Sequence, residues 1–178
     1  MPSLKTFRTV NEYDTCHFYA ISGSTYPVTK GTFVSLPGGS GSVPGQEPVS
    51  MAGGVGAAWA NTVAQRYAVT PRVVVSASGD TPFGMLLYDV REIDENGEKL
   101  LFYPQKQAEM QCVLSGQPVP IVFKGIFDYS GVVGNPVAGA SAYLNAAGGL
   151  GCVACGSAVG RLLGVKGSAG WVRLKLDV

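Results

Sequence analysis

The sequence contains few charged residues. Acidic and basic residues make up 14% of the 178 residues, against a usual share of about 25%. The formal net charge is only +1, and no run of lysine and arginine forms a basic stripe. The chain therefore lacks the electrostatic signature of a nucleic-acid-binding protein. Because exteriors with little charge tend to associate, the composition favours a protein whose surface is largely covered by partners.

Long apolar runs and abundant cysteine are missing as well. No stretch approaches the ~18 consecutive apolar residues of a transmembrane helix, and the first 14 residues lack the apolar core of a signal peptide. We therefore expect a soluble protein that neither spans a membrane nor uses a signal peptide. The four cysteines are too few for a disulfide-built scaffold, and a chain of this length can fold without disulfides or metals.

Catalytic motifs are scarce. His17 is the only histidine, so any Ser-His or Cys-His nucleophile system would have to use it. The stretch Gly38–Ser42 breaks the G-x-S-x-G pattern of a hydrolase nucleophile elbow. Residues 54–59 begin like a dinucleotide fingerprint, but Trp59 occupies the third glycine position. We expect neither enzymatic activity nor a bound cofactor.

Cys152 and Cys155 have the C-x-x-C spacing that can hold a metal or form a redox pair. A structural zinc needs four ligands, and neither a second C-x-x-C nor an H-x-x-x-H pair supplies the others. The adjacent Cys16 and His17 could do so only with awkward geometry. We favour small buried cysteines with no metal, and a small metal or redox protein is the alternative.

Residues 21–56 have a composition of their own. Thirteen of these 36 residues are glycine or proline, a density that disfavours a helix or a central strand. The segment is nevertheless too apolar for a solvated linker. We expect an extended arm that orders against a partner, and a long surface loop folded over its own domain is the alternative. The domain organisation predicted is an N-terminal strand and arm at 1–56 and a mostly-β body at 57–178, forming one structural unit.

Large side chains outside the clear strands are common anchors of protein interfaces. On this ground the candidate partner-interface residues are Phe33, Val34, Trp59 and Tyr67. Each of them could equally belong to the core. The stretch 55–69 shows a four-residue apolar spacing that also allows a short helix.

The remainder of the chain has a strand-rich pattern. Residues 72–77 predict a buried strand, and residues 171–178 alternate apolar with polar side chains as a strand with one buried face does. Short segments separated by glycine-rich turns fill residues 119–163, and residues 105–110 could form one helical turn. The fold class predicted is mainly β, a small β-barrel or sandwich with a long Gly/Pro-rich N-terminal arm.

The pair Asn96-Gly97 is the strongest local turn signal, because a two-residue type I′ turn requires positive φ at both positions. It predicts a hairpin between residues 85–93 and 99–103. Four acidic residues surround the turn and could suggest paired carboxylates or a calcium loop, but a solvated hairpin tip is the favoured interpretation. These acidic residues are Glu92, Asp94, Glu95 and Glu98.

Two parts of the second half resemble virion structural proteins of tailed phages. Residues 84–91, followed by the Asn-Gly turn, residues 113–122 and Gly125-Ile126-Phe127, look like the central part of such proteins. Residues 134–144, Gly148-Gly149, residues 159–163 and the closing alternating strand resemble the small β-barrel of capsid decoration (cement) proteins. The matches are patterns of glycine, turn and strand, and the first half of the chain contributes none.

The resemblance implies a protein made in the host cytoplasm that attaches to the outside of an assembled phage head. Its partners would be the major capsid protein, whose subunits it would brace, and copies of itself, commonly in a homotrimer. Neither nucleic acid nor membrane is implied, and no catalytic or metal-binding residue is carried over. A phage tail or baseplate component is the alternative within the same class.

Overall fold

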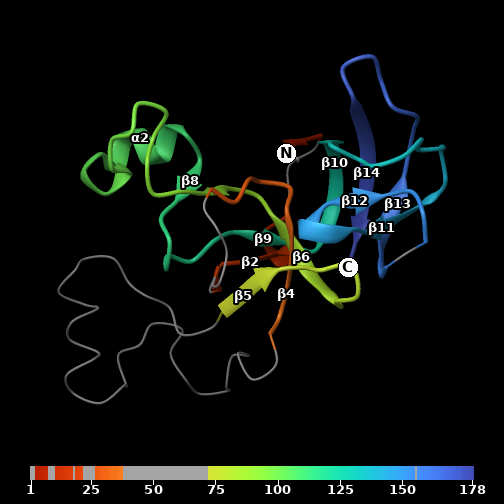
Figure 1. The fold of residues 1–178 in the computed structure, drawn as a ribbon, viewed down its shortest axis with the longest axis horizontal. Coiled ribbons are helices and arrows are strands. Elements are labelled where there is room, and N and C mark those ends of the chain that lie inside the picture. The colour runs from red at the N-terminus through yellow and green to blue at the C-terminus, as the bar shows by residue number, and fades with distance from the viewer. Residues whose placement is uncertain (1–2, 8–10, 18, 22–26, 38–71, 155) are drawn as a thin grey trace.

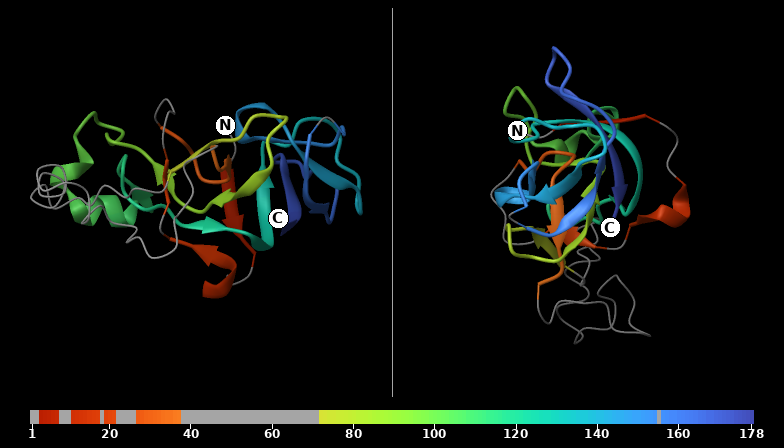
Figure 2. Two further views of the ribbon diagram at one scale, coloured as in Figure 1. Left: turned by 90° about the horizontal axis from the view of Figure 1, so that it is seen from below. Right: turned by 90° about the vertical axis from the view of Figure 1, so that its right-hand side faces the viewer.

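The computed structural model describes residues 3–7, 11–17, 19–21, 27–37, 72–154 and 156–178. These residues form a mainly β protein of three parts, which lie next to one another along the longest axis of the molecule (Figures 1 and 2). A curled, half-barrel sheet forms one end, a second sheet forms the middle, and a smaller lobe with a short helix forms the other end. The predicted fold class is confirmed in its mainly-β character.

The half-barrel has six strands in the order β1-β10-β14-β13-β11-β12, counted over the described residues, with antiparallel pairing throughout. Its bounds are β1 Ser3–Thr6, β10 Lys124–Ser130, β11 Ser141–Leu144, β12 Leu150–Gly151, β13 Ala158–Leu162 and β14 Trp171–Asp177. A 3-10 turn, η3 (Ala146–Gly148), connects β11 to β12. In β14 the apolar positions Val172, Leu174 and Leu176 are buried, whereas Arg173, Lys175 and Asp177 are exposed, which confirms the predicted alternation.

The central sheet has the order β2-β9-β6-β4-β5-β3 among the described residues. Its bounds are β2 Thr15–Cys16, β3 Ala20–Ile21, β4 Phe33–Ser35, β5 Arg72–Val75, β6 Pro82–Leu86 and β9 Ile121–Val122. A 3-10 turn, η1 (Glu12–Asp14), precedes β2. All pairs are antiparallel except β3 with β5.

The lobe, defined here as residues 88–118, contains the short parallel pair β7 (Asp89–Val90) and β8 (Cys112–Val113), the 3-10 turn η2 (Leu100–Phe102) and the helix α2 (Pro104–Glu109). Pro104 occupies the first turn of α2, where its missing N–H costs no hydrogen bond. This helix confirms the helical turn predicted near residues 105–110. No helix in the described part of the chain has the length and apolar character needed to cross a membrane.

The main core lies between the two sheets. Strands of the central sheet contribute alternate residues to its two faces: Phe33, Met85 and Val122 pack into the half-barrel. Their chain neighbours Val34, Leu86 and Ile121 pack on the opposite face. The central sheet is therefore buried on both sides, which explains its nearly continuous apolar strands.

The predicted arm is not confirmed, and part of it is folded into the body. Within residues 21–56 the structure describes 21 and 27–37, and there β4 lies between β5 and β6 in the central sheet. The prediction that glycine and proline density prevents a central strand is wrong at this place, because Gly31 and Pro37 lie outside the three-residue strand instead of interrupting it. The remainder of the predicted arm, and the stretch 55–69, lie outside the described residues.

The predicted hairpin at Asn96-Gly97 exists in a reduced form. Ile93 and Lys99 form an isolated antiparallel bridge, and the N–H of Asp94 donates to the Glu98 carbonyl at 2.9 Å. Gly97 adopts φ 85° but Asn96 keeps a negative φ, so the turn is not of type I′. The first predicted arm, residues 85–93, contains only the end of β6 and the two-residue strand β7. The second predicted arm, residues 99–103, forms the 3-10 turn η2. The prediction of two long strands is therefore wrong.

Candidate interaction surfaces

The structure places two of the four predicted interface residues inside the molecule. Phe33 and Val34 in β4 are both 0% exposed and belong to the cores on opposite faces of the central sheet. The core role that the sequence left open for them is therefore the one observed here. Trp59 and Tyr67 lie outside the described residues. Candidate surfaces must be sought among other exposed side chains.

The described cysteines have surroundings that disfavour thiolate chemistry. Burial raises the pKa of the Cys112 thiol, and the Cys112 Sγ donates to the Gln107 carbonyl at 3.5 Å. Burial likewise raises the pKa of the partly exposed Cys152, against the opposing effect of Lys166. Cys155 lies outside the described residues. Over the described ranges, no three His, Cys, Asp or Glu side chains gather as metal ligands would.

The only histidine is not part of a nucleophile system in the described region. His17 is exposed, and its Nε2 lies 3.0 Å from the Thr15 Oγ1. This contact joins residues two apart on the chain, and it requires no particular fold. His17 therefore gives no geometric support for hydrolytic chemistry.

Asp94 organises the lobe. Its carboxylate is buried, accepts hydrogen bonds from the N–H groups of Asn96 and Glu98 at 2.8 Å each, and forms an ion pair with Lys106 of α2. The hydrogen bond from Lys106 lowers the pKa of Asp94, burial opposes it, and the two backbone N–H groups lower it further. The Lys106 pKa is raised by the same pair. Asp94 thus joins the acidic turn to the helix, and the predicted solvated tip describes Glu92, Glu95 and Glu98 but not Asp94.

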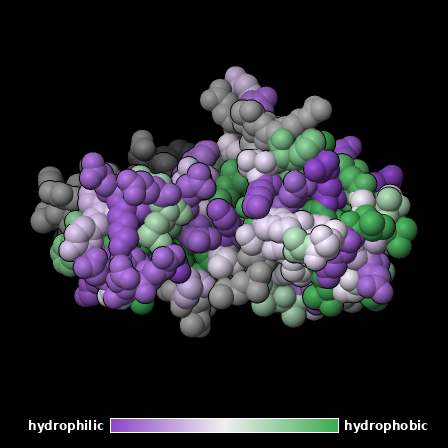
Figure 3. All heavy atoms as spheres, turned by 90° about the horizontal axis from the view of Figure 1, so that it is seen from above, coloured by the Kyte–Doolittle hydropathy of each residue, from purple (hydrophilic) through white to green (hydrophobic). Residues whose placement is uncertain are grey.

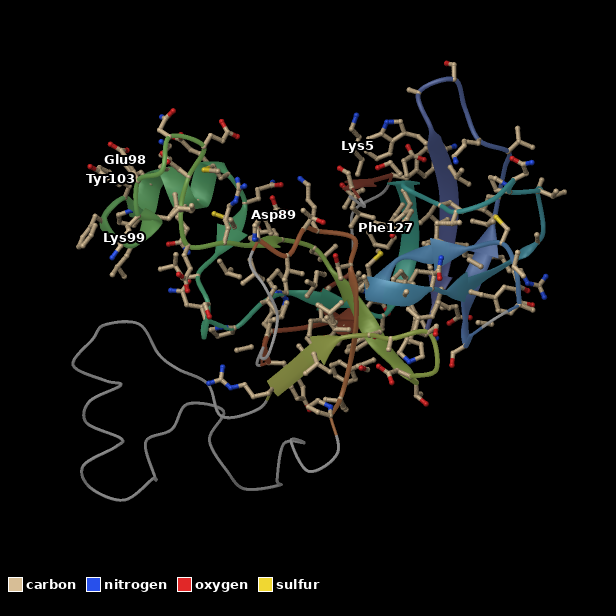
Figure 4. All side chains as sticks on the ribbon, in the orientation of Figure 1. Lys5, Asp89, Glu98, Lys99, Tyr103 and Phe127 are labelled. Atoms are coloured by element: carbon tan, nitrogen blue, oxygen red, sulfur yellow. The ribbon has the colours of Figure 1, made fainter. Side chains whose placement is uncertain are left out.

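The lobe exposes a cluster of large apolar side chains. In η2 only Leu100 is buried, and the residues that follow it are directed outward. Phe102 is 69% exposed. Figure 4 shows Tyr103 beside Glu98 and Lys99 at the outer end of the lobe, with Asp89 at its junction with the central sheet. The lobe patch consists of Ile93, Leu101, Phe102 and Tyr103.

Two hollows accompany the lobe patch. One is lined by Glu92, Ile93, Lys99, Leu101, Leu114 and Ser115. The other is lined by Phe102, Tyr103, Pro104, Gln105, Lys106 and Glu109. Each lining combines apolar with charged residues, as protein-binding surfaces do.

The opposite end of the molecule exposes a second apolar cluster, on the loops of the half-barrel. Hydrogen bonds hold these loops together: the Gly139 N–H donates to the Leu162 carbonyl at 2.7 Å, and the side-chain Nζ of Lys166 donates to the Val132 carbonyl at 3.0 Å. Green, hydrophobic side chains gather at this end in Figure 3, whereas the lobe is mostly purple. The half-barrel patch consists of Val133, Val137, Val153, Leu163 and Val165.

The outer face of the half-barrel is polar along β10 and β14, and two cross-strand ion pairs lie on it. Asp128 lies directly opposite Arg173 and pairs with it at 2.9 Å, and Lys124 lies opposite Asp177 at 3.4 Å. Arg173 also stacks on Phe7, with 3.7 Å from its guanidinium carbon to the ring centre. Cross-strand pairs of this kind stabilise a solvated sheet face, so the charges of these two pairs are matched within the chain.

No protein-family model, curated protein or solved structure matches this chain. The function has to be inferred from the sequence pattern and from the two patches. Sequence reasoning missed the lobe patch because it assigned Phe102 and Tyr103 to a hairpin strand, and it missed the half-barrel patch because that patch consists of valine and leucine residues. For the half-barrel patch, the available signal was that Leu163 and Val165 flank Gly164 in the turn between β13 and β14.

Proposed function

We propose that this chain is a non-catalytic structural protein that works by binding large protein surfaces, and that it decorates the outside of a tailed-phage head. The observation that carries the proposal is the presence of two separate exposed apolar patches at opposite ends of one continuous β protein. A protein built this way can contact two neighbours at once, and repeated sites on a shell multiply modest contacts by avidity.

The assignment to a phage head rests on the resemblance of the second half of the chain to decoration proteins. In that role the protein would lie across neighbouring major capsid protein subunits and associate with copies of itself, as a homotrimer in the form the resemblance implies. The absence of strong net charge agrees with a protein partner rather than nucleic acid.

Co-sedimentation of the purified protein with undecorated, expanded heads tests the assignment. We expect saturable binding at a fixed ratio to capsid subunits. Phe102→Asp, in the lobe patch, should reduce binding, because a charge placed in an apolar contact must be desolvated. Tyr13→Asp is a matched control, because Tyr13 is 86% exposed and belongs to neither patch.

Absence of saturable binding to heads would overturn the capsid assignment. Cryo-EM location of the protein on the tail or baseplate of intact particles would replace it with the alternative virion role. If Tyr13→Asp and Phe102→Asp reduced binding equally, the lobe patch would no longer be supported as the surface that contacts the head.

A further inference from the structure

The two ends of the molecule have opposite charge. The lobe contains six acidic and three basic residues, which gives a formal charge of −3. Residues 119–178, which supply most of the half-barrel, contain five basic and two acidic residues, which gives +3. The overall value of +1 conceals this separation.

Several acidic side chains of the lobe form no ion pair with any residue that the structure describes. Both ion pairs seen in the described lobe use Lys106, with Asp94 and with Glu98. Glu92 and Glu95 flank the exposed Ile93 and lie within 4 Å of no basic group in the described residues. Glu92 also lines the hollow beside Leu101. Unpaired negative charge therefore adjoins the lobe patch.

The half-barrel shows the reverse arrangement. Arg161 of β13 lies directly opposite Lys175 of β14, and neither forms an ion pair within the described chain. Like charges directly opposite each other destabilise a strand pair, in contrast to the matched pairs of the same face at Asp128–Arg173 and Lys124–Asp177. Arg161 and Lys175 line a shallow hollow in which Gly160 contributes no side chain.

These cations adjoin the half-barrel patch. Arg161 and Leu163 are both exposed and are two residues apart, the spacing of one strand face, and Val165 continues along the same hairpin. Each end of the molecule thus combines exposed apolar side chains with unpaired charge, and the sign of the charge differs between the ends. An apolar contact flanked by opposite charges is the pattern of complementary interfaces.

We propose that the lobe of one copy of this chain binds the half-barrel end of a second copy, with Glu92 and Glu95 facing Arg161 and Lys175 and with the two apolar patches buried between them. The proposal deepens the assembly function proposed above and rests on it, since it names a second copy as the partner of both ends. The contact joins two different surfaces, so it is heterologous: it generates a ring where the rotation closes and an open chain where it does not.

Charge reversal tests the proposal on the free protein. One variant carries Glu92→Lys and Glu95→Lys, and the other carries Arg161→Glu and Lys175→Glu. In either variant both ends of the molecule have charge of the same sign, so like charges would meet across the contact. We therefore expect self-association of each variant on its own to be at least about tenfold weaker than that of the natural chain. Mass photometry and sedimentation equilibrium give the oligomer distribution. Raised salt should weaken the natural association as well.

Two further samples separate the proposed contact from general electrostatic effects. A mixture of the two variants places opposite charges together again, and it should form mixed oligomers. A chain with all four reversals has the natural net charge and should associate alone about as strongly as the natural chain. Asp14→Lys is a control, because Asp14 belongs to neither patch and forms no ion pair in the described structure. Thermal melts confirm that every variant folds.

The proposal is overturned if the natural chain is monomeric at all concentrations, if both reversed variants associate like the natural chain, or if neither the mixture nor the four-fold variant regains association. These outcomes are separable from head binding. A monomer that still saturates heads would remove the self-contact and leave the decoration role. Charge-dependent oligomers that do not bind heads would do the reverse.

Discussion

The half-barrel and the lobe are stabilised by different means. Fifteen buried residues form the half-barrel core, and they include Phe127 and Tyr129 at 0% exposure. Only Leu100, Cys112 and Leu114 form the core of the lobe. The lobe is stabilised in addition by polar contacts. One is the Asp94–Lys106 ion pair. The other is centred on the side-chain oxygen of Gln117, which accepts hydrogen bonds from the Leu114 N–H at 2.9 Å and from the Gln107 Nε2 at 3.0 Å.

The difference teaches that the two regions should respond to different perturbations. Apolar burial is the main stabilising term of the half-barrel, and it scales with the area removed from water. The lobe depends on a charged pair and on few apolar contacts, so we expect it to open locally without global unfolding. Three predictions follow from the contrast, in decreasing order of effect.

Truncation of each core separates the two regions most strongly. Phe127→Ala leaves a cavity in the half-barrel (Figure 4), and we expect a loss of about 3–5 kcal/mol in the global free energy of unfolding. Leu100→Ala should instead increase amide hydrogen exchange within residues 88–118 while the half-barrel amides keep their protection. Urea titration and hydrogen exchange measure these results. Equal loss of protection in both regions for Leu100→Ala would show that the lobe is not independently openable.

A methyl group at Gly84 is the next largest perturbation. A Cβ there would lie 2.5 Å from the Ile121 Cγ2 and 2.9 Å from the Val122 carbonyl oxygen, in the middle of the central sheet. We expect Gly84→Ala to lower the free energy of unfolding by about 1–3 kcal/mol. Gly79→Ala is the matched control, because nothing lies within 4 Å of its added Cβ and its φ is not in the left-handed region. A control loss as large as that of Gly84→Ala would assign the effect to something other than crowding.

The Asp94–Lys106 pair should make the lobe, but not the half-barrel, sensitive to extreme pH. The Asp94 pKa is lowered from its ordinary 3.8, so its contribution is present above that value and is lost as pH falls through the lowered pKa. The Lys106 pKa is raised from 10.5, so its contribution is present below that value and is lost as pH rises through the raised pKa. Hydrogen exchange of the lobe against pH measures both losses.

Asp94→Asn should remove the acid-side change and reduce lobe protection at neutral pH. Asp128→Asn is the matched control, because Asp128 also forms an ion pair but lies on the outer face of the half-barrel, and it should leave the lobe unchanged. An unaltered acid-side profile in Asp94→Asn would show that another group governs the lobe.

The parts of the fold that were predictable from sequence are those set by local pattern. The alternation in residues 171–178 identified β14 with its buried face, and the pattern near residues 105–110 identified α2. The hairpin arms around Asn96-Gly97 were not predictable, because β6 instead pairs with β4 and β9, which are distant in sequence. β4 was missed for the same reason: its strand conformation depends on β5 and β6 on either side, not on its glycine-rich surroundings.

The candidate surfaces were less predictable than the fold. An aromatic residue in a glycine-rich segment can be an anchor or a core residue, and Phe33 is in the core because Gly31 and Thr32 turn the chain beneath the half-barrel. The charge separation between the lobe and residues 119–178 was present in the sequence. The position of the unpaired positive charge could not be read from the sequence, because it depends on the β-sheet register that places Arg161 opposite Lys175.

Glycines at the contact between the two sheets also have a mechanical consequence. A Cβ at Gly148 would lie 2.6 Å from the Phe33 carbonyl oxygen, and one at Gly156 would lie 2.5 Å from the Ser78 carbonyl oxygen, so backbone meets backbone at both places. The Gly148 N–H donates to the Ser76 carbonyl at 2.8 Å. At these two places backbone contacts backbone directly, in addition to the side-chain core between the sheets, so we expect the half-barrel and the central sheet to resist sliding past each other.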